Sequence, residues 1–280
     1  MDYLHRAKIF KTKKRLGQNF LVNPKTIEFI TADIQPEDTV VEIGAGAGFV
    51  TEQLVKKAKH VFAIELDEDA VKELKKIQCD NLTIVHQDIL KTDISEFAKS
   101  GKIRIVANIP YYITAPIIAH LLGEVDDLTN KNRISISDIL IMVQKEVAQR
   151  IVANETSPAK QYGLLTILSQ FWAECEIVRE VGRRSFYPAP KVDSAIVKMV
   201  VRDVPRLELA DYGHFKRTVK ASFLHRRKNI KNCLLSGGFD KENVAKSLNN
   251  LNLDETVRGE SLSIEKFGEL SKELIKNAKG

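Results

Sequence analysis

The sequence predicts an α/β protein: a Rossmann-like, doubly wound and mostly parallel sheet, followed by a small domain made only of helices. Two observations predict the sheet. Short β-branched runs alternate with helical patterns, and a glycine turn at 44–48 directly follows the first long run. A third observation sets the domain boundary, because no strand pattern appears beyond Pro205. We therefore expect domains at 1–204, beginning with a basic arm at 1–23, and at 205–280.

The predicted elements follow in chain order. Asn23 before Pro24 is a typical N-cap and first helical residue, so a helix through Ile30 should begin there. Strands are expected at 39–43, 60–64, 82–85, 103–107, 138–143, 175–178 and 195–201. Helices are expected at 49–57, 67–77, 115–122, 145–153 and 163–172, and then at 212–223, 228–235, 241–248 and 264–278. Right-handed crossovers place the turns after the parallel strands at one edge of the sheet.

Composition describes an ordinary globular protein of 280 residues, with 44% hydrophobic and 29% charged residues. The net charge of +6 is distributed unevenly. Two blocks contain no acid: Arg6, Lys8, Lys11, Lys13, Lys14 and Arg15 form the first, and Lys216, Arg217, Lys220, Arg226, Arg227, Lys228 and Lys231 the second. Such blocks favour a polyanionic partner, since each neutralised phosphate releases counterions. The alternative is two solvated helix faces.

The three cysteines, Cys79, Cys175 and Cys233, are odd in number and form no CxxC pair. This pattern argues against a disulfide framework and a zinc site, and it is typical of a reducing cytosol. The longest apolar run, Ile139–Val143, is far shorter than the ~20 residues that cross a bilayer. The amino terminus lacks the apolar region of a secretory signal, although its basic character is shared with organellar transit peptides. We expect a cytoplasmic protein that uses no metal.

The stretch Asn108-Ile109-Pro110-Tyr111 follows a buried strand, where ligands of open α/β sheets bind. An aromatic exocyclic amine is a poor nucleophile until hydrogen-bond acceptors draw its nitrogen toward sp³ geometry. The Asn108 side-chain oxygen and the Ile109 carbonyl are candidate acceptors. Pro110 would fix the turn, and Tyr111 could stack on a base. The alternative is a strand-ending turn with one core aromatic residue.

A nucleoside-containing cofactor is indicated by three successive strand ends. The turn with Gly44, Gly46 and Gly48 lets the backbone approach a ligand, but it matches neither the dinucleotide fingerprint nor the phosphate loop. Glu65 could hold a ribose diol and Asp88 an adenine amino group. S-adenosylmethionine fits this order, whereas a nicotinamide dehydrogenase is disfavoured. The alternatives are a solvated strand-end carboxylate for Glu65 and a helix N-cap for Asp88.

With these residues assembled, the chain resembles the KsgA/RsmA family of small-subunit ribosomal RNA adenine dimethyltransferases. The resemblance runs nearly end to end and rests on the segments 16–21, 44–48, Glu65, 87–88, 108–111, 144–148, 186–195, 226–228 and 258–263. It implies that S-adenosylmethionine is bound by Gln18, Asn19, Leu21, Gly44, Gly46, Glu65, Asp88 and Asn108. It also implies that Tyr111 and Phe186 sandwich the target adenine.

The resemblance further implies a monomer that methylates N6 of two adjacent adenosines near the 3′ end of 16S rRNA, within the small ribosomal subunit or its precursor. Erm-type enzymes, which methylate 23S rRNA, share the Asn-x-Pro-Tyr motif and are the nearest alternative. The segments at 186–195 and 258–263 favour the small-subunit enzymes, and a mitochondrial transcription-factor relative is disfavoured further. A ribosome-assembly factor that acts mainly by binding remains a second alternative.

Overall fold

The computed structural model describes residues 2–10, 12–13, 17–99, 101–158, 160–225 and 227–278. The chain divides into two compact units: Met1–Gly123 with Thr129–Ala148 and Glu174–Val201 form the first, and Glu124–Leu128 with Gln149–Ala173 and Arg202–Gly280 form the second. The boundary predicted at 204/205 placed Gln149–Ala173 in the first domain. The structure groups this segment with the later helices, because the ring of Phe171 stacks on Phe215 with centroids 5.4 Å apart.

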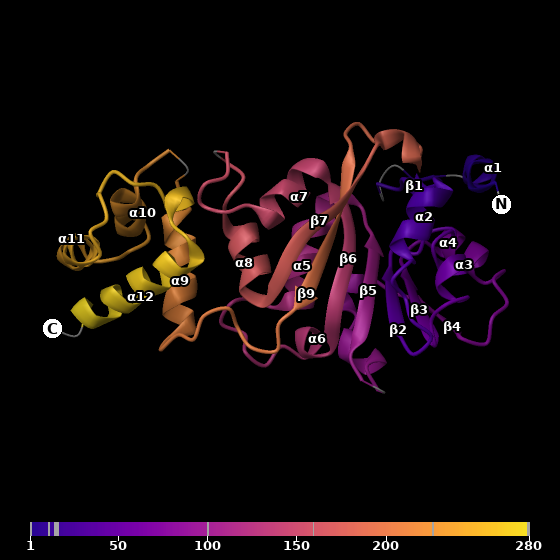
Figure 1. The fold of residues 1–280 in the computed structure, drawn as a ribbon, viewed down its shortest axis with the longest axis horizontal. Coiled ribbons are helices and arrows are strands. Elements are labelled where there is room, and N and C mark those ends of the chain that lie inside the picture. Colours follow the sequence, from indigo (N-terminus) through magenta and orange to yellow (C-terminus); the bar gives the residue numbers. More distant parts are fainter. Residues whose placement is uncertain are drawn as a thin grey trace. The chain divides into compact units, whose positions relative to one another are not determined.

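The first unit contains a seven-stranded sheet in the order β4-β3-β2-β5-β6-β9-β7 (Figure 1). Its strands are β2 (Thr39–Ile43), β3 (His60–Glu65), β4 (Leu82–His86), β5 (Ile103–Asn108), β6 (Ile136–Gln144), β7 (Ala173–Val181) and β9 (Ser194–Val201). Strands β4, β3, β2, β5 and β6 run parallel to one another, and β9 is antiparallel to β6. This is the predicted doubly wound α/β sheet, whose order reverses beside β2.

The first unit also contains helices. They are α1 (Tyr3–Ile9), α2 (Pro24–Ile30), α3 (Thr51–Leu54), α4 (Glu68–Leu74), α5 (Thr114–Leu122), α6 (Lys131–Ile134) and the start of α7 (Lys145–Val152), which continues into the second unit after Ala148, with 3-10 turns at Ile89–Lys91, Ile94–Phe97, Tyr111–Ile113 and Arg183–Ser185. The N-cap predicted for α2 is present, since the Asn23 side chain accepts from the amides of Lys25 and Thr26. The helix expected at 49–57 is shorter, because only Thr51–Leu54 forms α-helix.

The amino-terminal residues form more structure than a basic arm. Helix α1 buries Tyr3 and Ala7, and Arg6 forms an ion pair of 2.7 Å with Glu52. The two-residue strand β1 (Phe20–Leu21) then pairs antiparallel with β8 (Phe186–Tyr187) in a separate small sheet. The sequence predicted neither helix α1 nor this pairing. Residues 11 and 14–16, which carry part of the first basic block, lie outside the described residues.

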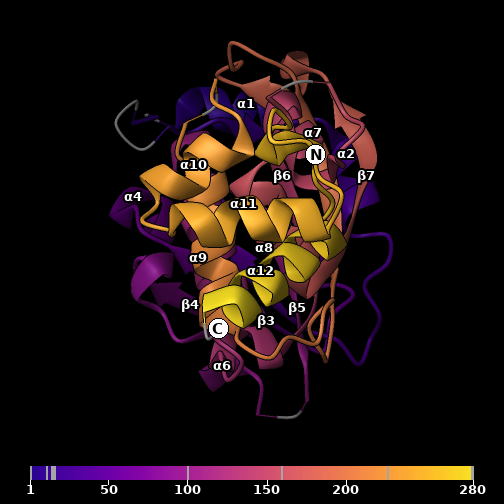
Figure 2. The ribbon, with the colours of Figure 1, turned by 90° about the vertical axis from the view of Figure 1, so that its left-hand side faces the viewer.

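The second unit is helical, with α8 (Leu164–Trp172), α9 (Tyr212–Ser222), α10 (Ile230–Ser236), α11 (Lys241–Asn250), α12 (Ile264–Ala278) and a 3-10 turn at Gly259–Ser261. Helices α9 to α12 gather in one cluster (Figure 2). Part of the second basic block is engaged inside the unit: Lys216 lies 2.8 Å from Asp126, and Lys220 lies 3.4 Å from Glu124. Position 226 lies outside the described residues. No described helix is long and apolar enough to cross a membrane.

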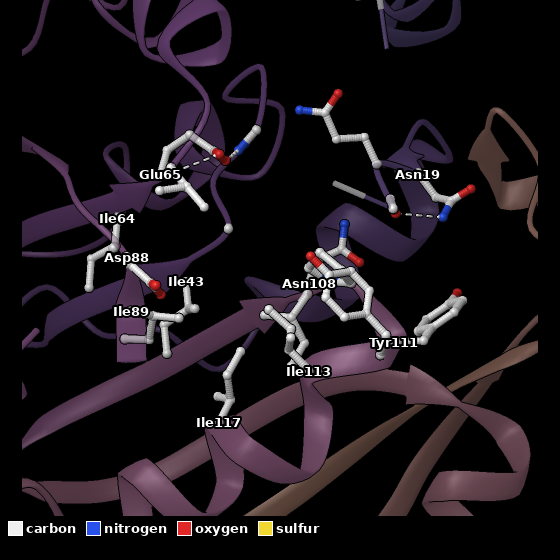
Figure 3. A pocket seen from close by; sticks show the side chains of 18 of the residues that line it. Asn19, Ile43, Ile64, Glu65, Asp88, Ile89, Asn108, Tyr111, Ile113 and Ile117 are labelled. Carbon is white, nitrogen blue, oxygen red and sulfur yellow. Dashed lines mark hydrogen bonds between the residues drawn. The ribbon is translucent and has the colours of Figure 1, made fainter. Parts of the chain in front are cut away.

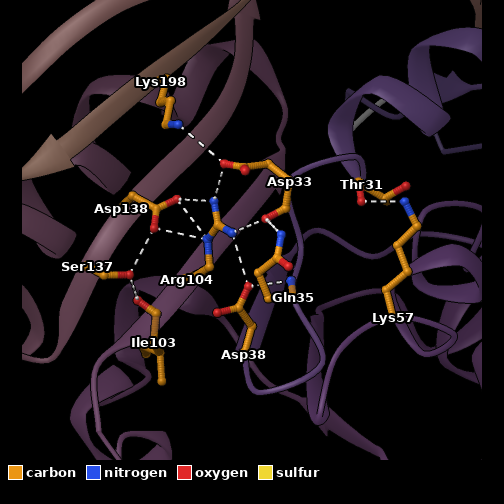
Figure 4. Close-up of polar contacts among 10 residues, drawn as sticks. All are labelled: Thr31, Asp33, Gln35, Asp38, Lys57, Ile103, Arg104, Ser137, Asp138 and Lys198. Atoms are coloured by element: carbon orange, nitrogen blue, oxygen red, sulfur yellow. Dashed lines mark hydrogen bonds and ion pairs between the residues drawn. The ribbon is translucent and has the colours of Figure 1, made fainter.

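An ionic cluster lies near the amino end of β5, where Arg104 contacts three aspartates (Figure 4). Its guanidinium nitrogens lie 3.0 Å from oxygens of Asp33, Asp38 and Asp138. The hydrogen bond and charge of Arg104 hold the pKa of Asp33 below its ordinary value. The cluster joins the loop before β2 to β5 and β6. It therefore lies toward the end of β5 opposite Asn108.

Candidate active site

A pocket opens at the carboxyl ends of β2, β3, β4 and β5, the sheet edge at which the predicted site residues were expected to meet (Figure 3). Its space is about 860 Å³, including the open mouth. This is the size range of small-molecule and cofactor sites. The lining residues are Gly17, Gln18, Asn19, Phe20, Ile43, Gly44, Gly46, Ile64, Glu65, Leu66, Gln87, Asp88, Ile89, Asn108, Ile109, Pro110, Tyr111, Tyr112, Ile113 and Ile117.

The glycine turn after β2 needs glycine for both conformation and space. Gly44 has φ +73°, and a Cβ added there would lie 3.1 Å from the carbonyl oxygen of Asn108. Gly46 has φ +56°, and its Cβ would lie 2.9 Å from Cε1 of Phe20. Residues that carry a side chain rarely adopt these positive φ values. The turn thereby brings bare backbone to the pocket wall.

Glu65 ends β3 and is held by the backbone around it. Its Oε2 accepts from the Gly46 amide at 2.7 Å, and its Oε1 accepts from the amides of Leu66 and Asp67 at 2.8 Å each. Burial raises the pKa of Glu65, and these three donors oppose that shift. A carboxylate offers about four acceptor positions, so this group retains capacity for a ligand hydroxyl. Its orientation is fixed before any ligand binds.

Asp88 follows β4, where it caps the next turn and also lines the pocket. Its Oδ1 accepts from the Leu90 amide at 3.0 Å, which caps the 3-10 turn Ile89–Lys91. The same residue lines the pocket. The capping bond uses one oxygen position and leaves others for a donor such as an exocyclic amine. Glu65 and Asp88 face the pocket from one side, while Asn108 and Tyr111 face it from the other (Figure 3).

Asn108 is the last residue of β5, and Pro110 begins the turn that follows. The side-chain amide of Asn108 makes no hydrogen bond with any other part of the chain that the structure describes. The hydroxyl of Tyr111, in contrast, lies 2.7 Å from the hydroxyl of the buried Ser194. Burial raises the pKa of the Tyr111 hydroxyl, and the Ser194 bond opposes this shift. The pocket thus contains a side-chain amide that no described residue engages, beside an aromatic ring whose hydroxyl is held by Ser194.

Two of the residues implied by family resemblance do not line the pocket. Leu21 is 2% exposed and Phe186 is 4% exposed, and both belong to the core cluster that includes Phe20. Their strands pair with each other through the backbone, and their side chains pack in this core cluster. The sandwich of Tyr111 and Phe186 stays a prediction. Gln18 and Asn19 line the pocket as expected.

Sequence reasoning missed Phe20 and Tyr112 as lining residues. Phe20 belongs to the segment 16–21 that carries the family resemblance, and its ring lies against the glycine turn. Tyr112 follows Tyr111 directly, yet its side chain is 65% exposed at the pocket. Two adjacent aromatic residues after a strand are the signal that could have indicated it. Ser194 was also missed, because its contact joins positions 83 residues apart.

The donor set suits a nucleoside-type ligand. The described residues contain no group of three His, Cys, Asp or Glu side chains arranged to hold an ion. The pocket supplies instead a glycine cradle, a fixed carboxylate, a second carboxylate and isoleucine walls at Ile43, Ile64 and Ile89. These are the groups that a ribose, an adenine amine and an adenine ring require. S-adenosylmethionine therefore fits the residues present.

Comparison with known proteins supports this assignment. The family model described as "Ribosomal RNA adenine dimethylase" matches residues 9–276. "Ribosomal RNA small subunit methyltransferase A" of Clostridium botulinum is 42% identical over 94% of each chain, and the protein of the same description from Bacillus licheniformis is 40% identical over 95% of this chain and 92% of its own.

Two solved structures show the same fold. A dimethyladenosine transferase from Plasmodium falciparum superposes with a TM-score of 0.74 at 29% identity, covering 92% of this chain and 98% of its own. The 23S rRNA methyltransferase ErmE superposes with a TM-score of 0.68 at 28% identity, covering 92% of this chain and 100% of its own.

The doubly wound sheet and its pocket define a class I S-adenosylmethionine-dependent methyltransferase. Within that class, the chain belongs to the ribosomal RNA adenine dimethylase family. The family resemblance predicted from the sequence is thereby confirmed, as are the fold class and the enzyme class.

Proposed function

We propose that this enzyme converts two adjacent adenosines near the 3′ end of 16S rRNA to N6,N6-dimethyladenosine, in the small ribosomal subunit or its precursor. The relatives at about 40% identity carry the description of small-subunit methyltransferase, which supports this substrate. We further propose that the enzyme is cytoplasmic, acts as a monomer and contributes to small-subunit biogenesis. Because the 23S rRNA methyltransferase ErmE is 28% identical to this chain, 23S rRNA is the second candidate substrate.

One observation carries the proposed chemistry: at the carboxyl end of β5, the side-chain amide of Asn108 has no hydrogen-bond partner among the described residues. A partly buried polar group without a partner is costly unless a ligand or water completes its hydrogen bonds. The side-chain oxygen of Asn108 would accept an N–H of the adenine exocyclic amine. That hydrogen bond favours the pyramidal nitrogen, whose lone pair is available for bonding. The Ile109 carbonyl would accept the second N–H.

The aromatic residues of the turn would hold the base. Tyr111 lines the pocket and its hydroxyl is anchored by Ser194, so its ring is already oriented. Stacking on such a ring contributes ~1–3 kcal/mol per base. This offsets much of the few kcal/mol that flipping a base costs. Phe186 packs in the core cluster, so we propose Tyr111 as the principal contact.

The cofactor would be held by the other half of the pocket. Glu65 would accept from ribose hydroxyls, Asp88 from the adenine amine, and Gly44 and Gly46 would admit the ligand close to the backbone. When bound, S-adenosylmethionine supplies an electrophilic methyl group on a positively charged sulfur. The role of the chain's own residues is then to position the amine and exclude water, which accounts for a large share of rate enhancement in such sites.

A methyl-transfer assay tests this proposal directly. Labelled S-adenosylmethionine is offered with unmethylated small subunits, unmethylated 23S rRNA or mature ribosomes, and the nucleosides are identified by mass spectrometry. We expect dimethyladenosine in small-subunit RNA alone. Label only in 23S rRNA would show that the enzyme has the Erm-type activity instead. A protein that binds subunits without labelling any RNA would be an assembly factor.

Asn108→Ala tests the role of the amide. We expect kcat to fall by about 100-fold or more, because the acceptor acts as the amine becomes pyramidal, as in other preorganised polar sites. Cofactor affinity, measured by calorimetry with S-adenosylhomocysteine, should change only a few-fold. Asn108→Asp is the matched comparison, since it keeps the acceptor oxygen. An alanine variant with unchanged kcat would remove Asn108 from the mechanism.

A further inference from the structure

Two charged residues beside the pocket have no role in the chemistry described above. The Asp67 side chain follows β3 and is only 1% exposed. Its Oδ1 accepts a hydrogen bond from the ammonium of Lys13, and its Oδ2 accepts from Nε2 of Gln18 at 2.6 Å. The Lys13 ammonium also lies 2.6 Å from Oδ2 of Asp69. Asp67 therefore binds two residues of the amino-terminal segment at once.

The same residue is connected to the cofactor carboxylate through its backbone. The Asp67 amide donates to Oε1 of Glu65 at 2.8 Å. Glu65 and Gln18 both line the pocket, and Asp67 is bonded to each of them. A displacement of Asp67 would consequently affect the ribose end of the pocket and its amino-terminal wall together.

The amino-terminal wall also reaches the opposite side of the pocket. A Cβ added at Gly17 would lie 3.2 Å from Cβ of Pro110 and 3.4 Å from Cε1 of Tyr112. The segment at 17–20 thus extends from Asp67, after β3, to the turn after β5. On its carboxyl side it is held by the pairing of β1 with β8. On the amino side of the segment, Lys13 forms ion pairs with Asp67 and Asp69.

Helix capping alone does not explain Asp67. Its Oδ1 accepts from the Asp69 amide at 3.1 Å, which caps α4. Asn or Ser would serve that purpose equally well. A buried negative charge is costly unless it is paired and hydrogen-bonded. Here the pairing is supplied by Lys13 and the second oxygen is occupied by Gln18. The carboxylate is therefore matched to the amino-terminal segment rather than to the helix.

We propose that Asp67 and Lys13 are positioning residues that hold the segment at 17–20 across the cofactor pocket, so that this contact opens each time the cofactor enters or leaves. The proposal rests on the proposed function only for the identity of the ligand. It predicts that loss of the contact accelerates ligand dissociation. It also predicts that dissociation from the wild type is sensitive to salt, since partly exposed ion pairs are screened by ions.

The test measures S-adenosylhomocysteine binding to the full chain by stopped-flow fluorescence or surface plasmon resonance. Lys13→Met should raise the dissociation rate about threefold, the range of a partly exposed ion pair. Asp67→Asn keeps the helix cap and should raise the rate about tenfold, because two bonds lose their charged acceptor. Lys13→Arg should restore the wild-type rate, and Lys8→Met on α1 is the matched control.

Salt and hydrogen exchange supply readouts that a purely structural role would not change. Raising sodium chloride from about 50 to 500 mM should accelerate dissociation from the wild type but not from Lys13→Met. Ligand should protect the amides at 17–20 from exchange in the wild type and less so in Lys13→Met. Melting temperatures within a few degrees of wild type would show that the variants are folded.

The outcomes separate this inference from the proposed function. If Lys13→Met releases S-adenosylhomocysteine at the rate of Lys8→Met while the wild type methylates small subunits, the positioning role is refuted and the function stands. If Lys13→Met shows the predicted faster release but the wild type, although it binds the ligand, labels no ribosomal RNA, the function is refuted and the positioning role stands.

Discussion

Glu42 provides a prediction about stability that follows from burial. It is the fourth residue of β2 and is only 3% exposed. Its described side-chain hydrogen bond is from Thr51, whose hydroxyl lies 2.5 Å from Oε2. Burial raises the pKa of Glu42 from 4.5 to about 8; the Thr51 bonds oppose this shift and the nearby Glu65 charge adds to it. The folded protein therefore retains a proton here that the unfolded chain releases.

The sign of the effect follows from proton linkage. Between pH 4.5 and about 8, the folded state binds more protons at Glu42 than the unfolded state does. Stability contributed by this site is therefore complete at low pH and is lost as the pH rises through that window. A shift of this size corresponds to at most about 5 kcal/mol. Relaxation of the surroundings would reduce the measured value.

Glu42→Gln isolates the effect, because the amide keeps an oxygen for the Thr51 hydroxyl but cannot ionise. The free energy of unfolding is measured in urea by circular dichroism from pH 5 to 9, for the wild type and the variant. We expect the difference between them to shift in favour of the variant by a few kcal/mol across this range. Glu37→Gln, at an exposed site before β2, is the matched control.

Comparison with the variant at each pH cancels the other titrating groups. A difference between wild type and Glu42→Gln that stays constant from pH 5 to 9 would refute the reasoning, since Glu42 would then be ionised throughout. The same pH course for Glu37→Gln would show that the effect does not belong to burial.

Three further predictions concern the pocket and the sheet. Gly46→Ala should cost about 1–2 kcal/mol of stability from its positive φ, and it should also weaken S-adenosylhomocysteine binding in calorimetry, because the new Cβ meets the Phe20 ring. Arg104→Met should cost about 3 kcal/mol in urea unfolding by leaving Asp138 unpaired, with ligand affinity unchanged; an equal loss in Arg104→Lys would show that charge alone is insufficient. Tyr111→Phe should keep most RNA methylation while Tyr111→Ala loses it, and equal damage in both would exclude stacking as the role of this ring.

Most strands and the long carboxyl-terminal helix could be predicted from the sequence, because their signals are local. The run Thr39–Ile43 is β-branched and bounded by a glycine turn, and the structure has β2 at these residues. Helix α12 likewise spans Ile264–Ala278 as expected. Both patterns depend on neighbouring positions, where side-chain periodicity and conformational preference agree.

Helix α1 and the pairing of β1 with β8 could not be predicted in the same way. A helix of seven residues is marginal on its own and depends on tertiary contacts. Its Arg6 meets Glu52, which is 46 positions away. Strand β1 is two residues long, and its partner Phe186 is 165 positions beyond Leu21. No local pattern encodes such contacts.

The candidate site divides along the same line. The order of residues determined that a glycine turn, two acids and the Asn108 turn follow successive strands, and parallel pairing brings successive strand ends to one edge. Tertiary structure alone decided which side chains are free to act there. The side-chain amide of Asn108 has no hydrogen-bond partner among the described residues, whereas Phe186 packs in the core and Asp67 binds Lys13 and Gln18. Those outcomes depend on contacts between distant segments. Such contacts determine burial and hydrogen bonding, but local sequence patterns do not predict them.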